Sequence, residues 1–124
     1  MDAEKLNELY VKNGLTSKDI FKHKFYTIIS RSGIDKIQAN NNIVIEYDLI
    51  HNSPDNKCVI IKATAKCGDK TIQTFGESSP ANTAQAYPVS MAEKRAMSRA
   101  VLKLTGFYQL GHYSEDESDE FKRK

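Results

Sequence analysis

The sequence has no tryptophan and few of the residues that build metal sites or crosslinks: two cysteines and three histidines in 124 residues. Cys58 and Cys67 stand in a strand-like run, too far apart for a zinc-binding pair and without a histidine nearby. The histidines are scattered, so no spacing typical of a metal site appears. We therefore predict that the protein holds no metal.

Catalytic and membrane signatures are also missing. The chain has no glycine-rich phosphate loop, no nucleophile elbow and no Cys/His signature. No apolar run approaches the ~20 residues of a membrane span, and the N-terminal "MDAEKLNELY" is acidic and helical in pattern, unlike a signal peptide. We expect a cytoplasmic protein that is not an enzyme, carries no cofactor and does not enter a membrane.

What the chain does have is the composition of a globular protein, with 40% hydrophobic and 27% charged residues. Its length suits a single domain. The net charge is only +2, but the last twelve residues hold five acids, so that residues 1–112 carry a net charge of +4. We therefore expect one domain over residues 1–112 and an acidic, mobile tail over residues 113–124, a kind of segment that is often solvated.

Periodicity predicts the elements along the chain. The expected order is a helix over residues 3–13, a second short helix from Thr16 or Ser17 to residue 25, a turn at Ser32-Gly33 followed by one or two helical turns, a turn at 40–42, and strands over 42–50, 57–67 and 70–77. The middle of the chain therefore reads as an antiparallel meander.

The register of the last hairpin follows from its loop. If Gly68 and Asp69 form a two-residue turn, Cys67 opposes Lys70 and Ala65 opposes Ile72. Side chains alternate between the faces of a strand. One face then holds Ile61, Ala63, Ala65, Cys67 and Ile72, and the other holds Lys62, Thr64, Lys66, Thr71, Gln73 and Phe75. The first face suits a packed helix, whereas the second is a plain solvated surface or a surface for phosphates and bases.

A long helix follows. Ser90 and Glu93 fit a capping box at its start, and Gly106 fits a C-cap after Thr105. A stripe rich in alanine recurs at helical spacing and allows close approach to a sheet. We predict an α+β fold in which an antiparallel sheet of three or slightly more strands carries this long C-terminal helix across one face, with short helices at the N-terminus.

The same helix carries a row of cations. Arg95, Arg99 and Lys103 recur at every fourth position, with Lys94 beside them. Phosphate binding needs such a row, because each cation that neutralises a phosphate releases counterions. A solvated surface helix shows the same pattern, and charged runs usually are of that kind. The presence of only one acid between residues 78 and 114 favours phosphate binding.

These pieces resemble a known family. The order of three strands and a helix, with "FGE" ending the last strand and "A-x-x-R-A" in the helix, resembles the phage single-strand annealing proteins of the Erf and Sak type. That group belongs to the superfamily of the eukaryotic strand-annealing recombination mediator. The segments "RSGIDKI", "FGESSPANTAQAYP", "MAEKRAMSRAVLKLTG" and "YSEDESDEF" carry the resemblance, which covers roughly residues 26–121.

The resemblance implies a protein that binds single-stranded DNA in a basic groove, promotes strand annealing in phage-type recombination or replication, and assembles side by side with its own copies. Arg99 matches the arginine of the family's helix motif, although many annealers have two tandem cations where this chain has Ser98-Arg99. If the chain is phage-encoded, its location is the host cytoplasm. The predicted nucleic-acid contacts are Arg99, Arg95, Lys94, Lys103, Lys62 and Lys66.

Two other classes stay open at this point. One is a small phage or prophage protein that binds a host protein through its acidic tail and has no nucleic-acid activity. The other is an enzyme whose pocket the sequence does not reveal. Binding that weakens steeply with salt would support the nucleic-acid class, whereas a deep pocket with converging carboxylates would favour an enzyme.

Overall fold

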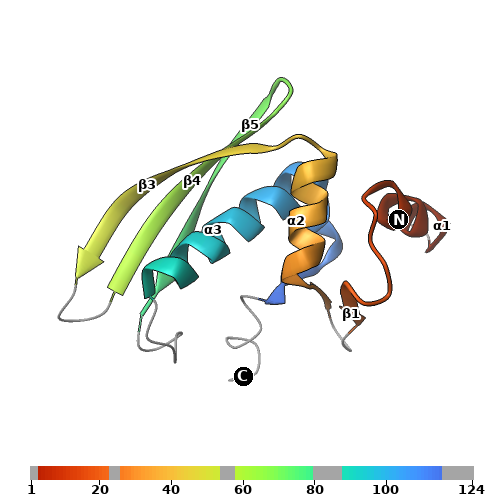
Figure 1. The fold of residues 1–124 in the computed structure, drawn as a ribbon, viewed down its shortest axis with the longest axis horizontal. Coiled ribbons are helices and arrows are strands. Elements are labelled where there is room, and N and C mark those ends of the chain that lie inside the picture. Colours follow the sequence, from red (N-terminus) through yellow and green to blue (C-terminus); the bar gives the residue numbers. More distant parts are fainter. Residues whose placement is uncertain (1–2, 23–25, 54–57, 80–87, 116–124) are drawn as a thin grey trace.

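The computed structural model describes residues 3–22, 26–53, 58–79 and 88–115. Its elements, in chain order, are α1 (Ala3–Lys12), β1 (Ile20–Lys22), β2 (Thr27–Ile29), α2 (Arg31–Asn40), β3 (Val44–Ser53), β4 (Cys58–Cys67), β5 (Lys70–Ser78), α3 (Pro88–Thr105), the 3-10 turn η1 (Tyr108–Leu110) and β6 (His112–Ser114). They form the predicted α+β fold, with the long helix α3 across one face of a sheet (Figure 1).

The described strands form two sheets. Sheet B has the order β3-β4-β5 and is antiparallel throughout, which confirms the predicted meander. The hairpin register is also confirmed, because Cys67 pairs with Lys70 and Ala65 with Ile72. Gly68 has a φ of 58°, a left-handed conformation that favours glycine in a tight turn. Lys62, Lys66 and Phe75 therefore project from the face of sheet B opposite α3, which we call the open face.

Small residues on both elements bring α3 close to sheet B. Ala96 and Ala100 of α3 and Ala63 and Ala65 of β4 are completely buried, as the matching of small-residue stripes predicted. The closest approach is at Gly76 of β5, where a Cβ atom would overlap the carbonyl oxygen of Ala92 and lie 2.5 Å from the amide nitrogen of Ala96. Glycine is thus required at position 76 by the helix that lies on it.

Three local predictions are wrong. Residues after Thr16 form a turn and then β1, not a second helix. Ser32 and Gly33 lie inside α2, because the side chain of Ser30 accepts the Gly33 amide and caps the helix there. The helix α3 begins at Pro88, so the expected capping box lies within it; proline fits the first turn, where its missing N–H leaves no helical bond unmade.

The second sheet, sheet A, has the order β1-β2-β6 and was not predicted. β2 runs antiparallel to β1 and parallel to β6, in which His112 pairs with Thr27. The amide of Arg31, at the start of α2, donates to Oε1 of Glu115 at 2.6 Å. Residues 113–115, which we expected in the tail, are thus held in the fold. Residues 116–124, the rest of the expected tail, lie outside the described part.

A buried carboxylate joins sheet A to α2. Asp19 is 3% exposed. Its carboxylate accepts hydrogen bonds from the Lys36 ammonium, the Thr16 amide and hydroxyl, and the hydroxyls of Ser30 and Ser32. The hydrogen bond from Lys36 is 2.7 Å long and makes the largest contribution to holding the pKa of Asp19 well below its usual range. Asp19 therefore stays ionised in the folded protein.

Asp19→Asn is expected to lower the free energy of unfolding at pH 7 by about 2 kcal/mol. The reason is that a carboxylate with a depressed pKa stabilises the fold at every pH at which it would be ionised in the unfolded chain. The wild type should lose this stabilisation as the pH falls below about 4, the ordinary carboxylate pKa. Urea unfolding at pH 7 and pH 3 measures both. Equal pH dependence of the variant and the wild type between these values would contradict the assignment.

The other core lies between α1, α3 and sheet A. Phe107 is completely buried and stacks on Tyr10, with ring centroids 6.1 Å apart. The Tyr10 hydroxyl lies 2.7 Å from Nε2 of His112. Burial lowers the pKa of His112, so the imidazole stays neutral in this apolar setting. This cluster attaches the first helix to the last strand.

Candidate nucleic-acid interface

The open face of sheet B has a different charge on each strand. β3 contributes Glu46 and Asp48, β4 contributes Lys62 and Lys66, and β5 contributes polar side chains and Phe75. The register places Asp48, Lys62 and Phe75 side by side in one row across the three strands. Positive charge is therefore confined to the middle of the face, with acids toward β3 and with the ring of Phe75 and the carboxylate of Glu77 toward β5.

Phe75 is the exposed aromatic of this face. Half of it is open to solvent (49%), although it follows a buried residue in the middle of β5. Its backbone carbonyl accepts a hydrogen bond from Nη1 of Arg99 at 2.6 Å. Since Lys62 is its cross-strand partner, Phe75 has a lysine beside it on the open face and an arginine at its backbone carbonyl, at the edge of β5.

Arg99 reaches this edge from α3 and holds Glu77 there. Its two terminal nitrogens each donate to one carboxylate oxygen of Glu77 at 3.0 Å. These hydrogen bonds lower the pKa of Glu77. The side chain of Arg99 is 16% exposed and that of Glu77 is 44% exposed. A planar guanidinium that binds a carboxylate in this way also suits a phosphate.

Arg95, one of the predicted nucleic-acid contacts, does not face solvent. It is 1% exposed, and its Nη1 donates to the carbonyl oxygen of Glu77 at 2.9 Å. The reason is that α3 lies along the outer strand of the sheet, where carbonyl groups point away from β4. Arg95 and Arg99 donate to two of these carbonyls, so the predicted row of cations partly closes an edge of sheet B.

Lys94 and Lys103 are half-buried residues of α3. The Lys103 ammonium lies 5.1 Å from the centre of the Tyr108 ring, a cation–π contact beyond the sheet. The helix and the open face are on opposite sides of sheet B. The six predicted residues therefore do not line one groove: Lys62 and Lys66 lie on the open face, Arg95 and Arg99 lie at the β5 edge, and Lys94 and Lys103 stay with the helix.

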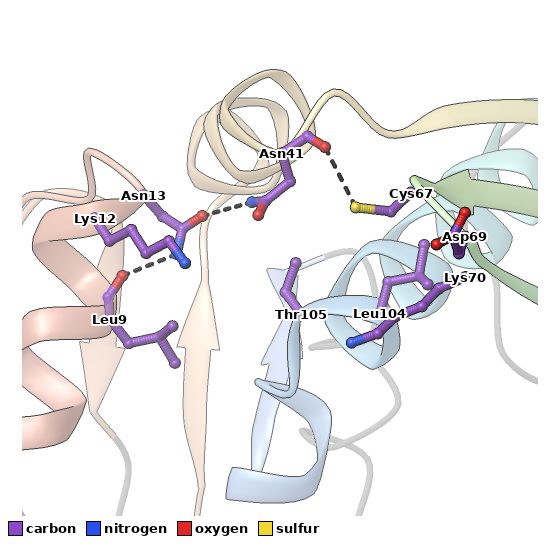
Figure 2. A pocket seen from close by; sticks show the side chains of 9 residues that line it. All are labelled: Leu9, Lys12, Asn13, Asn41, Cys67, Asp69, Lys70, Leu104 and Thr105. Atoms are coloured by element: carbon purple, nitrogen blue, oxygen red, sulfur yellow. Dashed lines mark hydrogen bonds between the residues drawn. The ribbon is translucent and has the colours of Figure 1, made fainter.

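A separate pocket opens where three helices end. Its volume is about 400 Å³, and it lies between the last residues of α1, α2 and α3 and the β4–β5 hairpin (Figure 2). The thiol of Cys67 donates to the carbonyl of Asn41 at 3.3 Å, and the side-chain amide of Asn41 donates to Oδ1 of Asn13 at 2.7 Å.

The charges of this pocket balance one another. Helix C-termini carry partial negative charge, and Lys12 and Lys70 line the pocket beside them, together with Asp69. The pocket is therefore a junction between elements rather than a second cationic surface. Within the described residues no group of His, Cys, Asp and Glu side chains is placed to hold a metal ion. In the same part of the chain, no helix is long and apolar enough to cross a membrane.

Comparison of the chain with protein-family models and with curated protein sequences finds no match. The likeness to phage strand-annealing proteins thus rests on the sequence motifs alone.

The contacts predicted from the sequence included neither Phe75 nor Glu77. The hairpin register already contained the signal for Phe75, because it pairs this residue with Lys62 on one face. The contact of Glu77 with Arg99 depends on where α3 crosses the sheet, and no periodicity gives that.

Proposed function

We propose that the protein binds single-stranded nucleic acid, with DNA favoured, along β4 and β5 on the open face of sheet B. The observation that carries the proposal is the half-exposed ring of Phe75, a residue with Lys62 as its cross-strand partner and Arg99 at its backbone carbonyl. Proteins that bind single strands combine cations that follow the backbone with aromatic rings on which bases stack. The acids on β3 repel phosphates from that strand, whereas the carboxylate of Glu77 on β5 is paired with the guanidinium of Arg99.

Such a surface reads the backbone and the flat face of any base. Lys62 and Lys66 lie on the same strand with three residues between them, and every second side chain points to the same face. Neither they nor Phe75 offers the fixed donor and acceptor pattern that base-specific recognition needs. Binding should therefore be nearly independent of sequence and should require bases that are not paired.

The wider role rests on the family resemblance. We propose that the protein promotes strand annealing in phage-type recombination or replication, without a catalytic step or a cofactor, as a homo-oligomer in the cytoplasm of the host. Annealing needs two strands held with their bases accessible, and an open sheet face is compatible with this.

The test is fluorescence anisotropy with a labelled oligo-dT and a duplex of equal length, measured across salt concentrations. The proposal expects tighter binding of the single strand and a linear fall of log K with log salt, with a slope of about −0.7 per neutralised phosphate. Equal affinity for the duplex would indicate a generic cationic surface. Absence of salt-dependent binding would overturn the proposal.

Glu77→Gln is expected to tighten single-strand binding about threefold to tenfold at low salt, because it removes a carboxylate that occupies the guanidinium of Arg99 and repels phosphates. Titrations of the variant against the wild type measure this. Glu46→Gln is the matched control, since it removes the same charge from the open face away from Arg99. If the two variants gain equally, or if Glu77→Gln still gains in an Arg99→Ala background, Glu77 does not compete with phosphate at this site.

A further inference from the structure

The two edges of sheet B differ in a way that the nucleic-acid site does not explain. At the β5 edge the carbonyls of Phe75 and Glu77 accept hydrogen bonds from Arg99 and Arg95. At the other edge, β3 pairs with β4 alone among the described strands. Every second residue of an edge strand directs its N–H and C=O away from the sheet. Within the described residues, β3 therefore offers an open ladder of backbone donors and acceptors, whereas two carbonyls of the β5 edge are occupied.

The helix also leaves β3 largely uncovered. Within the described residues, α3 packs mainly on β4 and β5. Figure 1 shows β3 as the outer strand of the sheet, continuing beyond α2 toward the end opposite α1. Leu49 is 59% exposed and Tyr47 is 39% exposed on the helix side of β3, and Ile50 is 51% exposed at the irregularity between Leu49 and His51. Exposed apolar residues on an edge strand mark an interaction site or an aggregation hazard.

The side chains of β3 specify what fits beside it. Glu46 and Asp48 project from the open face, and Tyr47 and Leu49 project from the helix side. A strand paired with β3 would place alternate side chains next to the acids and next to the apolar pair. Basic residues complement the first row and apolar residues the second.

We propose that the open edge of β3 binds an extended segment of a partner protein in which apolar and basic residues alternate. The added strand continues sheet B, with its basic side chains beside Glu46 and Asp48 and its apolar side chains over Tyr47 and Leu49. Nucleic acid does not suit this edge, because both acids repel phosphate. Antiparallel pairing of β3 with β3 of a second copy, centred on Tyr47, would set Glu46 against Asp48, which is destabilising.

The test uses the full chain without nucleic acid, so its outcome is independent of the proposed strand binding. The probe is an end-capped eight-residue peptide of alternating valine and lysine. Titration followed by amide NMR should give saturable shifts in β3, with protection from exchange of the amides that point away from β4. A peptide of the same composition with its valines and lysines in two blocks should bind at least about tenfold more weakly, because it cannot place all lysines on one face.

Variants separate edge pairing from general charge attraction. Glu46→Lys/Asp48→Lys should lower the affinity for the valine–lysine peptide at least about tenfold and transfer preference to a valine–glutamate peptide. The matched control Glu4→Lys/Glu8→Lys reverses two exposed acids of α1 and should leave the affinity within about twofold. Circular dichroism confirms that both variants are folded.

Backbone methylation gives the sharpest outcome. Two versions of the peptide, N-methylated at odd or at even positions, block opposite edges of the added strand, so that only one of them should lose binding. Equal losses, equal binding of the block peptide, or shifts outside β3 would overturn the proposal. Sedimentation of the free protein tests whether a second copy occupies the edge. If the protein self-associates and Glu46→Lys/Asp48→Lys abolishes this self-association, a second copy binds there and the proposal is overturned.

Discussion

Gly76→Ala is expected to destabilise the protein by about 3 kcal/mol, the upper end of the usual range for an overpacked core. The added Cβ would overlap the Ala92 carbonyl oxygen and lie 3.0 Å from the Cβ of Ala96. Neither group can rotate away, because the first belongs to the backbone of α3 and the second is fixed to it. The whole helix must therefore shift on sheet B. Thermal unfolding should show a midpoint lower by about 10 °C.

Gly68→Ala is the matched control. Gly68 has a positive φ, but nothing lies within 4 Å of a Cβ built there. Its replacement should cost only about 1 kcal/mol, from backbone strain. If Gly76→Ala unfolds at the same temperature as Gly68→Ala, α3 does not lie on β5 as closely as described.

Phe75→Ala/Lys62→Gln is expected to weaken single-strand binding by at least about 30-fold. Replacing one stacking ring by alanine removes about 1–3 kcal/mol of binding free energy per stacked base. Loss of one phosphate contact lowers the slope of log K against log salt by about 0.7. Both side chains lie on the open face, where truncation leaves no cavity in the core. The folded structure should therefore be unchanged, and anisotropy with labelled oligo-dT measures the loss.

The chain supplies a close control for this variant. Phe21 is 56% exposed on β1, and Lys22 follows it. Phe21→Ala/Lys22→Gln thus removes the same two residue types from sheet A and should leave affinity within about twofold. A similar loss in both variants would mean that binding depends on total charge, and the open face would not be the interface.

Sheet B and α3 were predictable because their signals are local. Alternation along residues 58–67 and the Gly68-Asp69 turn fix the hairpin, and a stripe of alanines fixes the buried side of the helix. Sheet A was not predictable for the opposite reason. Its strands have three residues each, too few for a period to appear, and β6 joins β2 from the far end of the chain.

The site was predictable only in part. The turn at Gly68-Asp69 is enough to place Lys62 and Phe75 on one face. The spacing of Arg95 and Arg99 showed that both lie on one side of α3, but spacing does not say what that side meets. It meets the edge of β5, so that Arg95 is buried while Arg99 reaches Glu77. Arg95 is thus a poor choice for a binding variant, because its removal leaves a buried carbonyl without its donor.

The parallel pairing of β2 with β6 has a consequence for the timing of folding. On a ribosome, β2 emerges early, whereas the residues of β6 that pair with it appear only after α3 is complete. Until then one side of β2 lacks its partner, and the first amide of α2 lacks the Glu115 carboxylate. Contacts between such distant segments form slowly, because a long loop must close first. Sheet B can assemble from neighbouring hairpins while the chain is still growing, but the other end of the molecule closes last, when residues 112–115 are released from the exit tunnel.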